Sequence, residues 1–210
     1  MRVIKEAEVR KNEILDAAAS LFAQKGFDHT TTNDIMNVVG IAKGTLYHHF
    51  KSKEDIMDAL IERQTAQVLA AAGRIAGDRG IPVEERMIRT IQALHIEVEG
   101  ETEGKELIDQ LHRPQNALMH QKMKQIILRR VPPMMAGIVK DGIDQGIYST
   151  PYPLECMEMT VCYLDIMLDD NVFELAGEQK REKVRAFLFL LERLLGVKEG
   201  QLAGFETVFL

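Results

Sequence analysis

Apolar residues recur at helical spacing through most of the chain. The segment from about Lys11 to Lys25 carries one apolar stripe, followed by Gly26 as a C-terminal stop. The stripe consists of Ile14, Ala18, Leu21 and Phe22. No segment shows the two-residue alternation, bounded by turn residues, that marks a β-strand. The pattern therefore predicts an all-α protein.

Two short helices with a turn between them are predicted after this segment. Three consecutive threonines, at 30–32, are candidate N-caps for a helix that ends before Gly40. A turn of a few residues then leads to a helix from Lys43 to Phe50. A capped short helix, a glycine-containing turn and a second short helix are typical of a helix-turn-helix.

The helix from Lys43 to Phe50 has two opposed faces. Leu46 and Phe50 can pack inward, and the predicted apolar neighbours are Leu21, Phe22, Ile35, Val38 and Ile41. Gly44 and His48 lie opposite Leu46. Helix propensity disfavours Gly44 by about 1 kcal/mol relative to alanine in a helix interior. A missing side chain is useful where backbone approaches another surface closely, as in a DNA major groove.

A long fourth helix is predicted to begin at Ser52, which is a good N-cap, and to run as far as Arg74. We place the domain boundary there, with a DNA-binding domain at 1–52 and a ligand-binding and dimerisation domain at 53–210. Pro132-Pro133 is predicted to break or kink the chain. The further helices are predicted at 83–98, 105–112, 114–130, 132–145, 153–170 and 178–195.

Charge is unevenly distributed. The net charge of −6 argues against a protein that coats nucleic acid indiscriminately. Residues 42–53, however, contain three lysines, two histidines and no acid. This local cationic face indicates one anionic partner met at one place. The N-terminus lacks the apolar region of a signal peptide, and no stretch is apolar enough to cross a membrane, so we expect a cytoplasmic protein without membrane contact.

Sequence features of enzymes and metal sites are lacking. We find no glycine-rich phosphate loop, no nucleophile elbow and no HExxH motif, so we expect neither an enzyme nor a cofactor or metal. Cys156 and Cys162 are six residues apart, which suits neither a local disulfide nor a shared metal ion. We predict that both are small buried apolar side chains.

The N-terminal motifs resemble those of the TetR family of regulators. The resemblance rests on Gly26-Phe27, Thr30-Thr31, Asp34-Ile35, Gly40, Lys43-Gly44-Thr45-Leu46-Tyr47-His48-His49-Phe50 and Ser52-Lys53-Glu54-Asp55. It covers about 45 residues with the family's spacing. Two departures are visible, Val39 in place of the usual alanine and Ala42 in place of a capping serine. The second removes one possible phosphate contact.

The resemblance implies a role for each matching residue. Thr31 would cap the second helix and contact DNA phosphate, and Tyr47, His48 and Lys53 would also contact phosphates. Base reading would fall to Lys43, Gly44 and Thr45, with His49 beside them. The implied protein is a homodimeric repressor that a small, largely hydrophobic inducer releases from a palindromic double-stranded DNA operator. Two alternatives remain: that these are merely solvent-facing polar residues, and that the chain is a helical dimeric protein-interaction module without specific DNA binding.

The C-terminal half offers a candidate pocket and a candidate dimer face. Its methionine-rich helices suit a hydrophobic ligand, although ordinary bundle core explains them as well. The predicted pocket residues are Leu94, His112, Met119, Met123, Ile127, Met135 and Met167. The last long helix is apolar all round at 186–191, which indicates either a dimer interface or burial within one subunit. The predicted interface residues are Met157, Val161, Leu164, Phe187, Leu190, Leu191 and Leu194.

Overall fold

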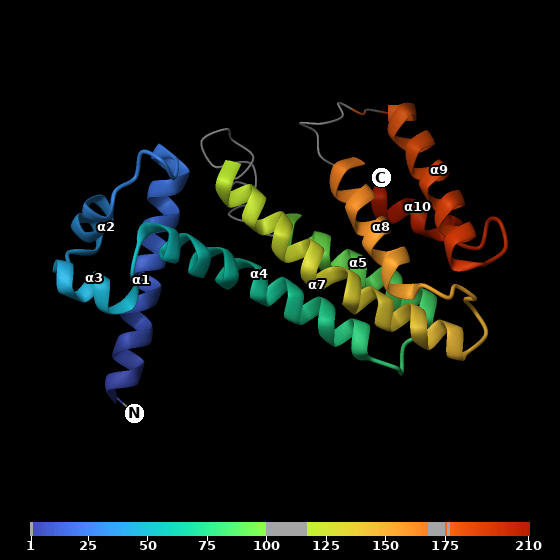
Figure 1. Cartoon of the computed structure of the whole chain (residues 1–210), viewed down its shortest axis with the longest axis horizontal. Coiled ribbons are helices and arrows are strands. Elements are labelled where there is room, and N and C mark those ends of the chain that lie inside the picture. Colours follow the sequence, from blue (N-terminus) through green and yellow to red (C-terminus); the bar gives the residue numbers. More distant parts are fainter. Residues whose placement is uncertain (1, 100–116, 168–174, 176) are drawn as a thin grey trace. The chain divides into compact units, whose positions relative to one another are not determined.

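The structure is a computed structural model that describes residues 2–99, 117–167, 175 and 177–210. Every regular element in these residues is a helix, which confirms the predicted all-α class (Figure 1). The elements are α1 (Arg2–Lys25), α2 (Thr32–Val39), α3 (Lys43–His49), α4 (Lys53–Gly77), α5 (Val83–Glu99), α7 (Ala117–Asp144), α8 (Pro153–Met167), α9 (Gly177–Leu195), the 3₁₀ turn η2 (Ala203–Phe205) and α10 (Glu206–Phe209). The helix predicted at 105–112 lies outside the described residues.

The described residues form two compact units. Unit 1 holds those up to Gln67 together with those between Val98 and Met123, and unit 2 holds Val68–Glu97 and Lys124–Leu210. Both α4 and α7 therefore contribute residues to each unit. The domain boundary between 52 and 53 stays a prediction. None of the described helices is long and apolar enough to cross a membrane.

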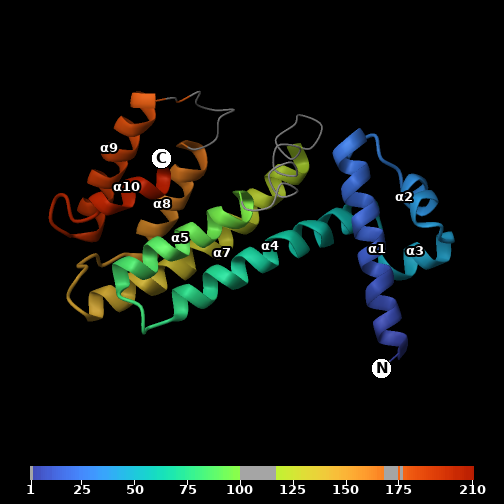
Figure 2. The same cartoon turned by 180° about the vertical axis from the view of Figure 1, so that it is seen from behind.

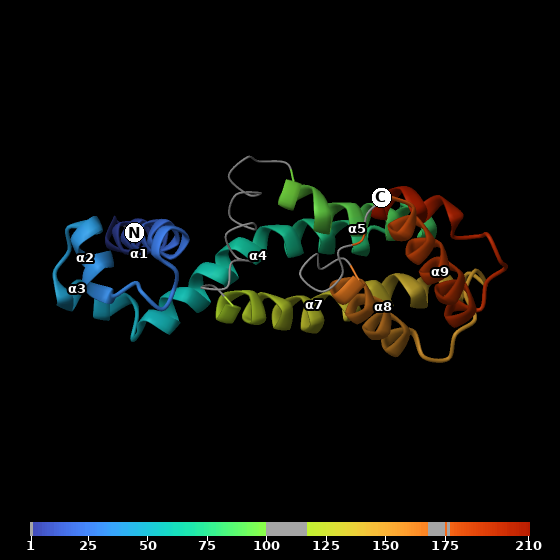
Figure 3. The same cartoon turned by 90° about the horizontal axis from the view of Figure 1, so that it is seen from above.

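Unit 1 packs α2 and α3 on one side of α1 (Figure 3). The predicted inward residues Leu46, Phe50 and Ile35 are buried, as is the α1 stripe. Val38 is an exception, because its side chain is 62% exposed. The buried side of α2 is centred on Ile35, and Val38 lies outside that buried side.

Unit 2 is built around α5, α7, α8 and α9 (Figure 2). One cluster of buried apolar side chains joins these helices with the C-terminal segment, and it includes Val83, Met87, Ile138, Met157 and Phe205. A sharp turn after α7 is fixed by Gly146 at φ 71°, a left-handed conformation that glycine adopts without strain. The turn brings Tyr148 back against Gly142.

Three predictions about local structure are wrong. The first helix begins at Arg2 rather than near Lys11, and the pattern missed its start because residues 7–9 are exposed and add nothing to the apolar stripe. The helix α7 runs through Pro132 and Pro133, where a break or kink separating two helices was predicted. A helix-interior proline costs about 3 kcal/mol, but burying a large apolar side chain contributes about 1.5–3 kcal/mol each, and the core lies on both sides of the prolines. Finally, Cys156 is buried as predicted, but Cys162 is exposed.

Candidate nucleic-acid interface

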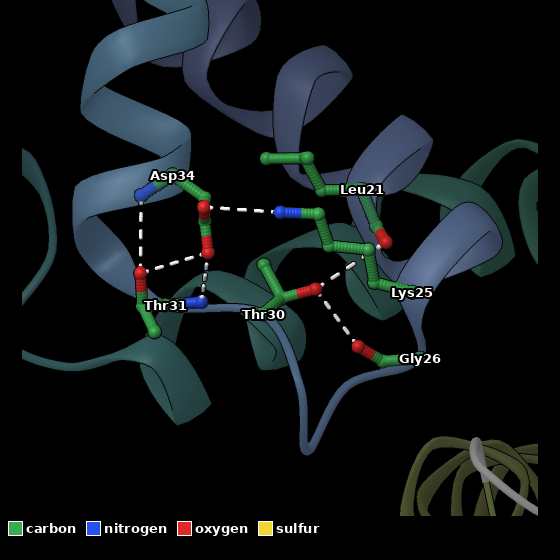
Figure 4. A network of polar contacts seen from close by, with 6 residues as sticks. All are labelled: Leu21, Lys25, Gly26, Thr30, Thr31 and Asp34. Atoms are coloured by element: carbon green, nitrogen blue, oxygen red, sulfur yellow. Dashed lines mark hydrogen bonds and ion pairs between the residues drawn. The ribbon is translucent and has the colours of Figure 1, made fainter.

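The start of α2 is fixed by a reciprocal pair of hydrogen bonds (Figure 4). The Asp34 backbone N–H donates to Thr31 Oγ1 at 3.1 Å, and the Thr31 backbone N–H donates to Asp34 Oδ2 at 2.8 Å. This capping box satisfies two backbone donors that a helix start otherwise leaves open. The hydrogen bonds from Thr31, backbone first and then hydroxyl, together with Lys25, lower the pKa of Asp34 to about 2. Thr31 is therefore the N-cap among the three candidate threonines.

The neighbouring Thr30 fixes the turn between α1 and α2. Its hydroxyl is fully buried, lies 2.8 Å from the Gly26 carbonyl oxygen and 3.3 Å from that of Leu21, and donates to them (Figure 4). Lys25 Nζ pairs with Asp34 Oδ1 at 3.0 Å across the same turn. The sequence pattern names Thr30 only as one of three possible caps. Its structural role could not be read from spacing, because it depends on carbonyls at the end of α1.

The helix α3 is anchored on one side and open on the other. Leu46 and the C-cap residue Phe50 are buried. Lys43, Gly44, Tyr47 and His48 are exposed, and Thr45 is half-buried. The Lys43 ammonium lies 5.8 Å from the centre of the Tyr47 ring, one helical turn away. Five of the eight predicted DNA-contacting residues thus lie on or beside one exposed face of a seven-residue helix.

Gly44 has open space around it. A Cβ atom built on Gly44 meets no atom within 4 Å, and its φ is not positive. Packing and backbone conformation within the chain therefore give no reason for glycine here. An external surface that approaches the backbone closely would give one.

His49 and Lys53 are held by the chain itself. The His49 ring is half-buried, and burial, followed by the positive charges of His48, Lys11 and Arg10, lowers the pKa of His49. Lys53 Nζ donates to the Phe27 carbonyl at 2.6 Å and lies 4.1 Å from the centre of the Phe27 ring. The Lys53 ammonium keeps two further protons for other acceptors.

Two ion pairs attach α4 to its neighbours within unit 1. Arg63 Nη2 of α4 lies 2.8 Å from Asp16 Oδ1 of α1. Lys122, near the start of α7, pairs with Asp58 of α4. The N-terminus of α4 is capped by Ser52, whose Oγ accepts from the Asp55 N–H at 3.1 Å, as the sequence predicts. The segment after α3 is therefore fixed to both α1 and α7.

The predicted pocket residues are distributed over both units. Leu94, Ile127, Met135 and Met167 belong to the core cluster of unit 2 or pack against it. Met119 and Met123 lie in unit 1, and His112 lies outside the described residues. Among the described residues, no group of three or more histidine, cysteine or acidic side chains could hold a metal ion.

The predicted interface residues divide into a buried and an exposed set. Met157, Val161, Phe187 and Leu191 are buried within the single chain, and Leu164 is half-buried. Leu190 is 57% exposed and Leu194 is also exposed. Further exposed apolar residues on the same two helices, missed by the sequence reading, are Met159, Tyr163, Ile166 and Phe189.

Comparison with known proteins identifies both halves of the chain. The family described as "Bacterial regulatory proteins, tetR family" matches residues 14–60. The family described as "Tetracyclin repressor-like, C-terminal domain" matches residues 101–189. These families describe regulators rather than enzymes.

Individual relatives match mainly at the N-terminus. The HTH-type transcriptional repressor KstR2 of Rhodococcus jostii is 50% identical over 52 residues, which are 25% of this chain and 26% of that protein. The KstR2 of Mycobacterium tuberculosis is 45% identical over 60 residues, 30% of its length. The chain thus aligns with less than a third of these relatives. The fatty acid metabolism regulator protein of Bacillus subtilis is 25% identical over 144 residues, 68% of this chain and 73% of that protein.

Solved structures share the fold over nearly the whole chain. SmeT, the repressor of the Stenotrophomonas maltophilia multidrug efflux pump SmeDEF, has a TM-score of 0.65 at 23% identity, covering 90% of this chain and 91% of SmeT. RolR in complex with resorcinol has a TM-score of 0.59 at 16% identity, covering 98% of this chain and 95% of RolR. The matched families, the relatives and the fold agree, and the chain belongs to the TetR family of bacterial transcriptional regulators.

Proposed function

We propose that this chain is a transcriptional repressor that binds a palindromic DNA operator as a homodimer and is released by a small, largely hydrophobic inducer. The observation that carries the proposal is the open face of α3, where Lys43, Gly44 and Tyr47 are exposed while Leu46 fixes the helix from behind. TetR regulators bind DNA operators, usually as dimers and with small-molecule ligands.

The α3 face combines the two kinds of contact that DNA recognition needs. The Tyr47 hydroxyl and the His48 ring can donate to phosphates, which position the protein. The Lys43 ammonium can meet the guanine acceptors O6 and N7, and the Thr45 methyl can contact the thymine methyl group. Thr31, exposed at the start of α2, and Lys53, with two free protons, supply phosphate contacts on either side. Half-buried His49 then serves mainly to support α3.

Two exposed apolar stripes support homodimerisation. On α8, Met159, Tyr163 and Ile166 follow helical spacing and are all exposed. On α9, Leu190 and Leu194 are one turn apart and exposed. Apolar residues on two adjacent helices fit a four-helix interface about a two-fold axis. Phe187 and Leu191 pack behind this face, inside each subunit, rather than across it.

The course of α4 and α7 suggests how an inducer could act on DNA binding. Each of these helices contributes residues to both units, and Lys122 of α7 pairs with Asp58 of α4 inside unit 1. A ligand that shifts either helix in unit 2 would move the residues that the same helix contributes to unit 1, the unit that holds α3. SmeT and RolR are each known in complex with a small aromatic ligand, triclosan and resorcinol, which supports a largely hydrophobic inducer here.

The proposal is tested by selecting bound sequences from random duplex DNA at two salt concentrations. The purified chain is compared with the double variant Lys43→Ala, Tyr47→Phe and with Lys140→Ala, which removes an exposed lysine of α7 in unit 2. We expect a palindrome to be enriched by the wild type and by Lys140→Ala, and to be lost in the double variant. The higher salt concentration should weaken binding of the palindrome by the wild-type protein.

The alternative is a dimeric protein-interaction module without specific DNA binding. A folded, ligand-free dimer that enriches no sequence would favour it and would contradict the repressor proposal. Enrichment of single half-sites by a monomer would retain DNA binding but contradict the dimeric mechanism.

A further inference from the structure

The buried face of α5 carries two polar residues at positions that its spacing assigns to the core. Val83, Met87 and Ile91 are buried in the apolar cluster of unit 2. Arg86 and Thr90, three and seven residues after Val83, lie in the same helical stripe and are 1% and 0% exposed. Arginine is rarely buried to this degree unless it is paired, so this arrangement calls for a partner of opposite charge.

The available carboxylate is already shared. Asp141 Oδ2 lies 2.9 Å from Arg86 Nη2, and Asp141 Oδ1 lies 2.8 Å from Nη2 of the exposed Arg79. Both oxygens of Asp141 are therefore engaged, and the three side chains together carry one excess positive charge. Because Asp141 is shared with the exposed Arg79, it compensates the charge of the buried Arg86 only in part, and water screens the buried charge poorly.

Several buried polar atoms on α5 and in the turn after α7 have no hydrogen-bond partner among the described residues. They are Nε and Nη1 of Arg86, Oγ1 of Thr90 and the hydroxyl of Tyr148. Leaving such a group unpaired costs about 1–3 kcal/mol, and more for a charged group. Natural proteins seldom keep several of them in one region unless an ordered molecule meets them.

Tyr148 comes to this region through the turn after α7. Its ring fills the space beside Gly142, where an added Cβ would lie 2.3 Å from Tyr148 Cδ2 and 3.1 Å from Val83 Cγ1. Gly142 directly follows Asp141, the partner of Arg86. Burial, and then the charge of Glu84, raises the pKa of Tyr148 to about 12, so its phenol stays protonated and can donate. Glu84 itself accepts a hydrogen bond from Gln201 at 2.9 Å.

We propose that Arg86, Thr90 and Tyr148 bind the carboxylate of an amphipathic small molecule whose apolar part lies against the methionine-containing core of unit 2. A carboxylate supplies further negative charge and offers about four acceptor sites on two oxygens, whereas a water molecule is neutral and accepts at most two hydrogen bonds. Apolar cluster residues on the same helix, Met87 and Ile91, suit the apolar part. This inference names the chemical class of the inducer and in that respect rests on the proposed function.

Calorimetric titration of the purified full chain tests the proposal with three probes: decanoate, 1-decanol and acetate. Decanoate should bind, and 1-decanol, which has the same chain without the charge, should bind at least about tenfold more weakly. Arg86→Met should lower the affinity for decanoate by about 10- to 100-fold and leave 1-decanol unaffected. Arg89→Met, which removes an exposed arginine of the same helix, is the matched control and should change neither.

Thr90→Val and Tyr148→Phe keep the proposal testable if Arg86→Met does not fold. Both remove a hydroxyl that has no hydrogen-bond partner among the residues that the structure describes, so each should weaken decanoate binding without lowering the melting temperature. Absence of decanoate binding to the wild type overturns the inference. So does equal affinity in the Arg86→Met protein, or a lower melting temperature with unchanged affinity in the two hydroxyl variants.

The proposed function and this inference can fail separately. Operator binding by the ligand-free protein is measured in parallel. If decanoate fails to bind but a palindrome is enriched, only the carboxylate site is wrong. If decanoate binds through Arg86 but no DNA is enriched, the site stands and the repressor proposal fails.

Discussion

Replacing Gly44 by alanine should move protein stability and DNA affinity in opposite directions. Gly44 lies in the first turn of α3 with helical backbone, and nothing lies within 4 Å of the added Cβ. The substitution therefore introduces no clash and removes the backbone entropy cost of glycine, so the free energy of unfolding should rise by up to about 1 kcal/mol. If α3 backbone approaches DNA at this point, the added methyl group should lower operator affinity at least about tenfold, or 1.4 kcal/mol.

The two effects are measured on the same protein preparation. Urea unfolding, with an unchanged slope, gives the stability change. Fluorescence anisotropy with the selected operator gives the affinity, and a random duplex of equal length gives the non-specific binding, which Gly44→Ala should leave nearly unchanged. A variant that is more stable and binds the operator as tightly as the wild type would refute the reasoning, because Gly44 would then not lie at a close contact with DNA.

Three other substitutions and one pH change test the rest of the site. Thr31→Ala should lower the free energy of unfolding by about 0.5–2 kcal/mol through loss of the N-cap, whereas Thr31→Ser should keep the cap; equal losses in both would contradict this role. Lys43→Ala should reduce the slope of log affinity against log salt by about one, and an unchanged slope would place Lys43 away from DNA. Leu190→Glu should raise the dimer dissociation constant in sedimentation experiments, because it puts a charge on an exposed apolar stripe; an unchanged dimer would move the interface elsewhere. The folded-state pKa of His49 lies below 6.5, so the stability that its neutral ring contributes is full above about pH 6.5 and is lost as the pH falls towards the folded-state pKa. Between about pH 7.5 and pH 5.5, the free energy of unfolding measured in urea should therefore fall less in His49→Gln than in the wild type.

The helix-turn-helix could be predicted because its signals are local. The cap at Thr31, the stop at Gly40 and the buried pair Leu46 and Phe50 all act within a few residues of the elements they define. Spacing alone could not choose among three threonines, since the choice depends on Asp34 and on carbonyls at the end of α1. The sequence pattern also predicted wrongly that Val38 packs inward, because apolar character alone does not show which flank of a short helix meets its neighbour.

The C-terminal half was less predictable because its apolar residues exceed what one face can bury. The periodicity of α9 cannot tell which side packs inside the subunit, so Phe187 and Leu190 were assigned together, although one is buried and the other exposed. The buried Arg86 was missed for the converse reason. Its partner Asp141 is distant in sequence, and an arginine between Val83 and Met87 breaks the apolar pattern that marks a core position.

The proposed DNA-binding face of α3 needs a second copy of the chain for specific binding, and the exposed apolar stripes of α8 and α9 offer a surface that could hold one. A seven-residue helix can place only a few side chains on base edges, and a good contact to a base discriminates by about 1–3 kcal/mol. Specific regulators bind their sites about 4–10 kcal/mol more tightly than random DNA, which one such helix supplies only in part. A second copy doubles the number of base contacts. The exposed apolar side chains around Leu190 and Tyr163 fit the proposed role of holding that copy. In the proposed dimer, the need for two half-sites and the exposure of these side chains have one explanation.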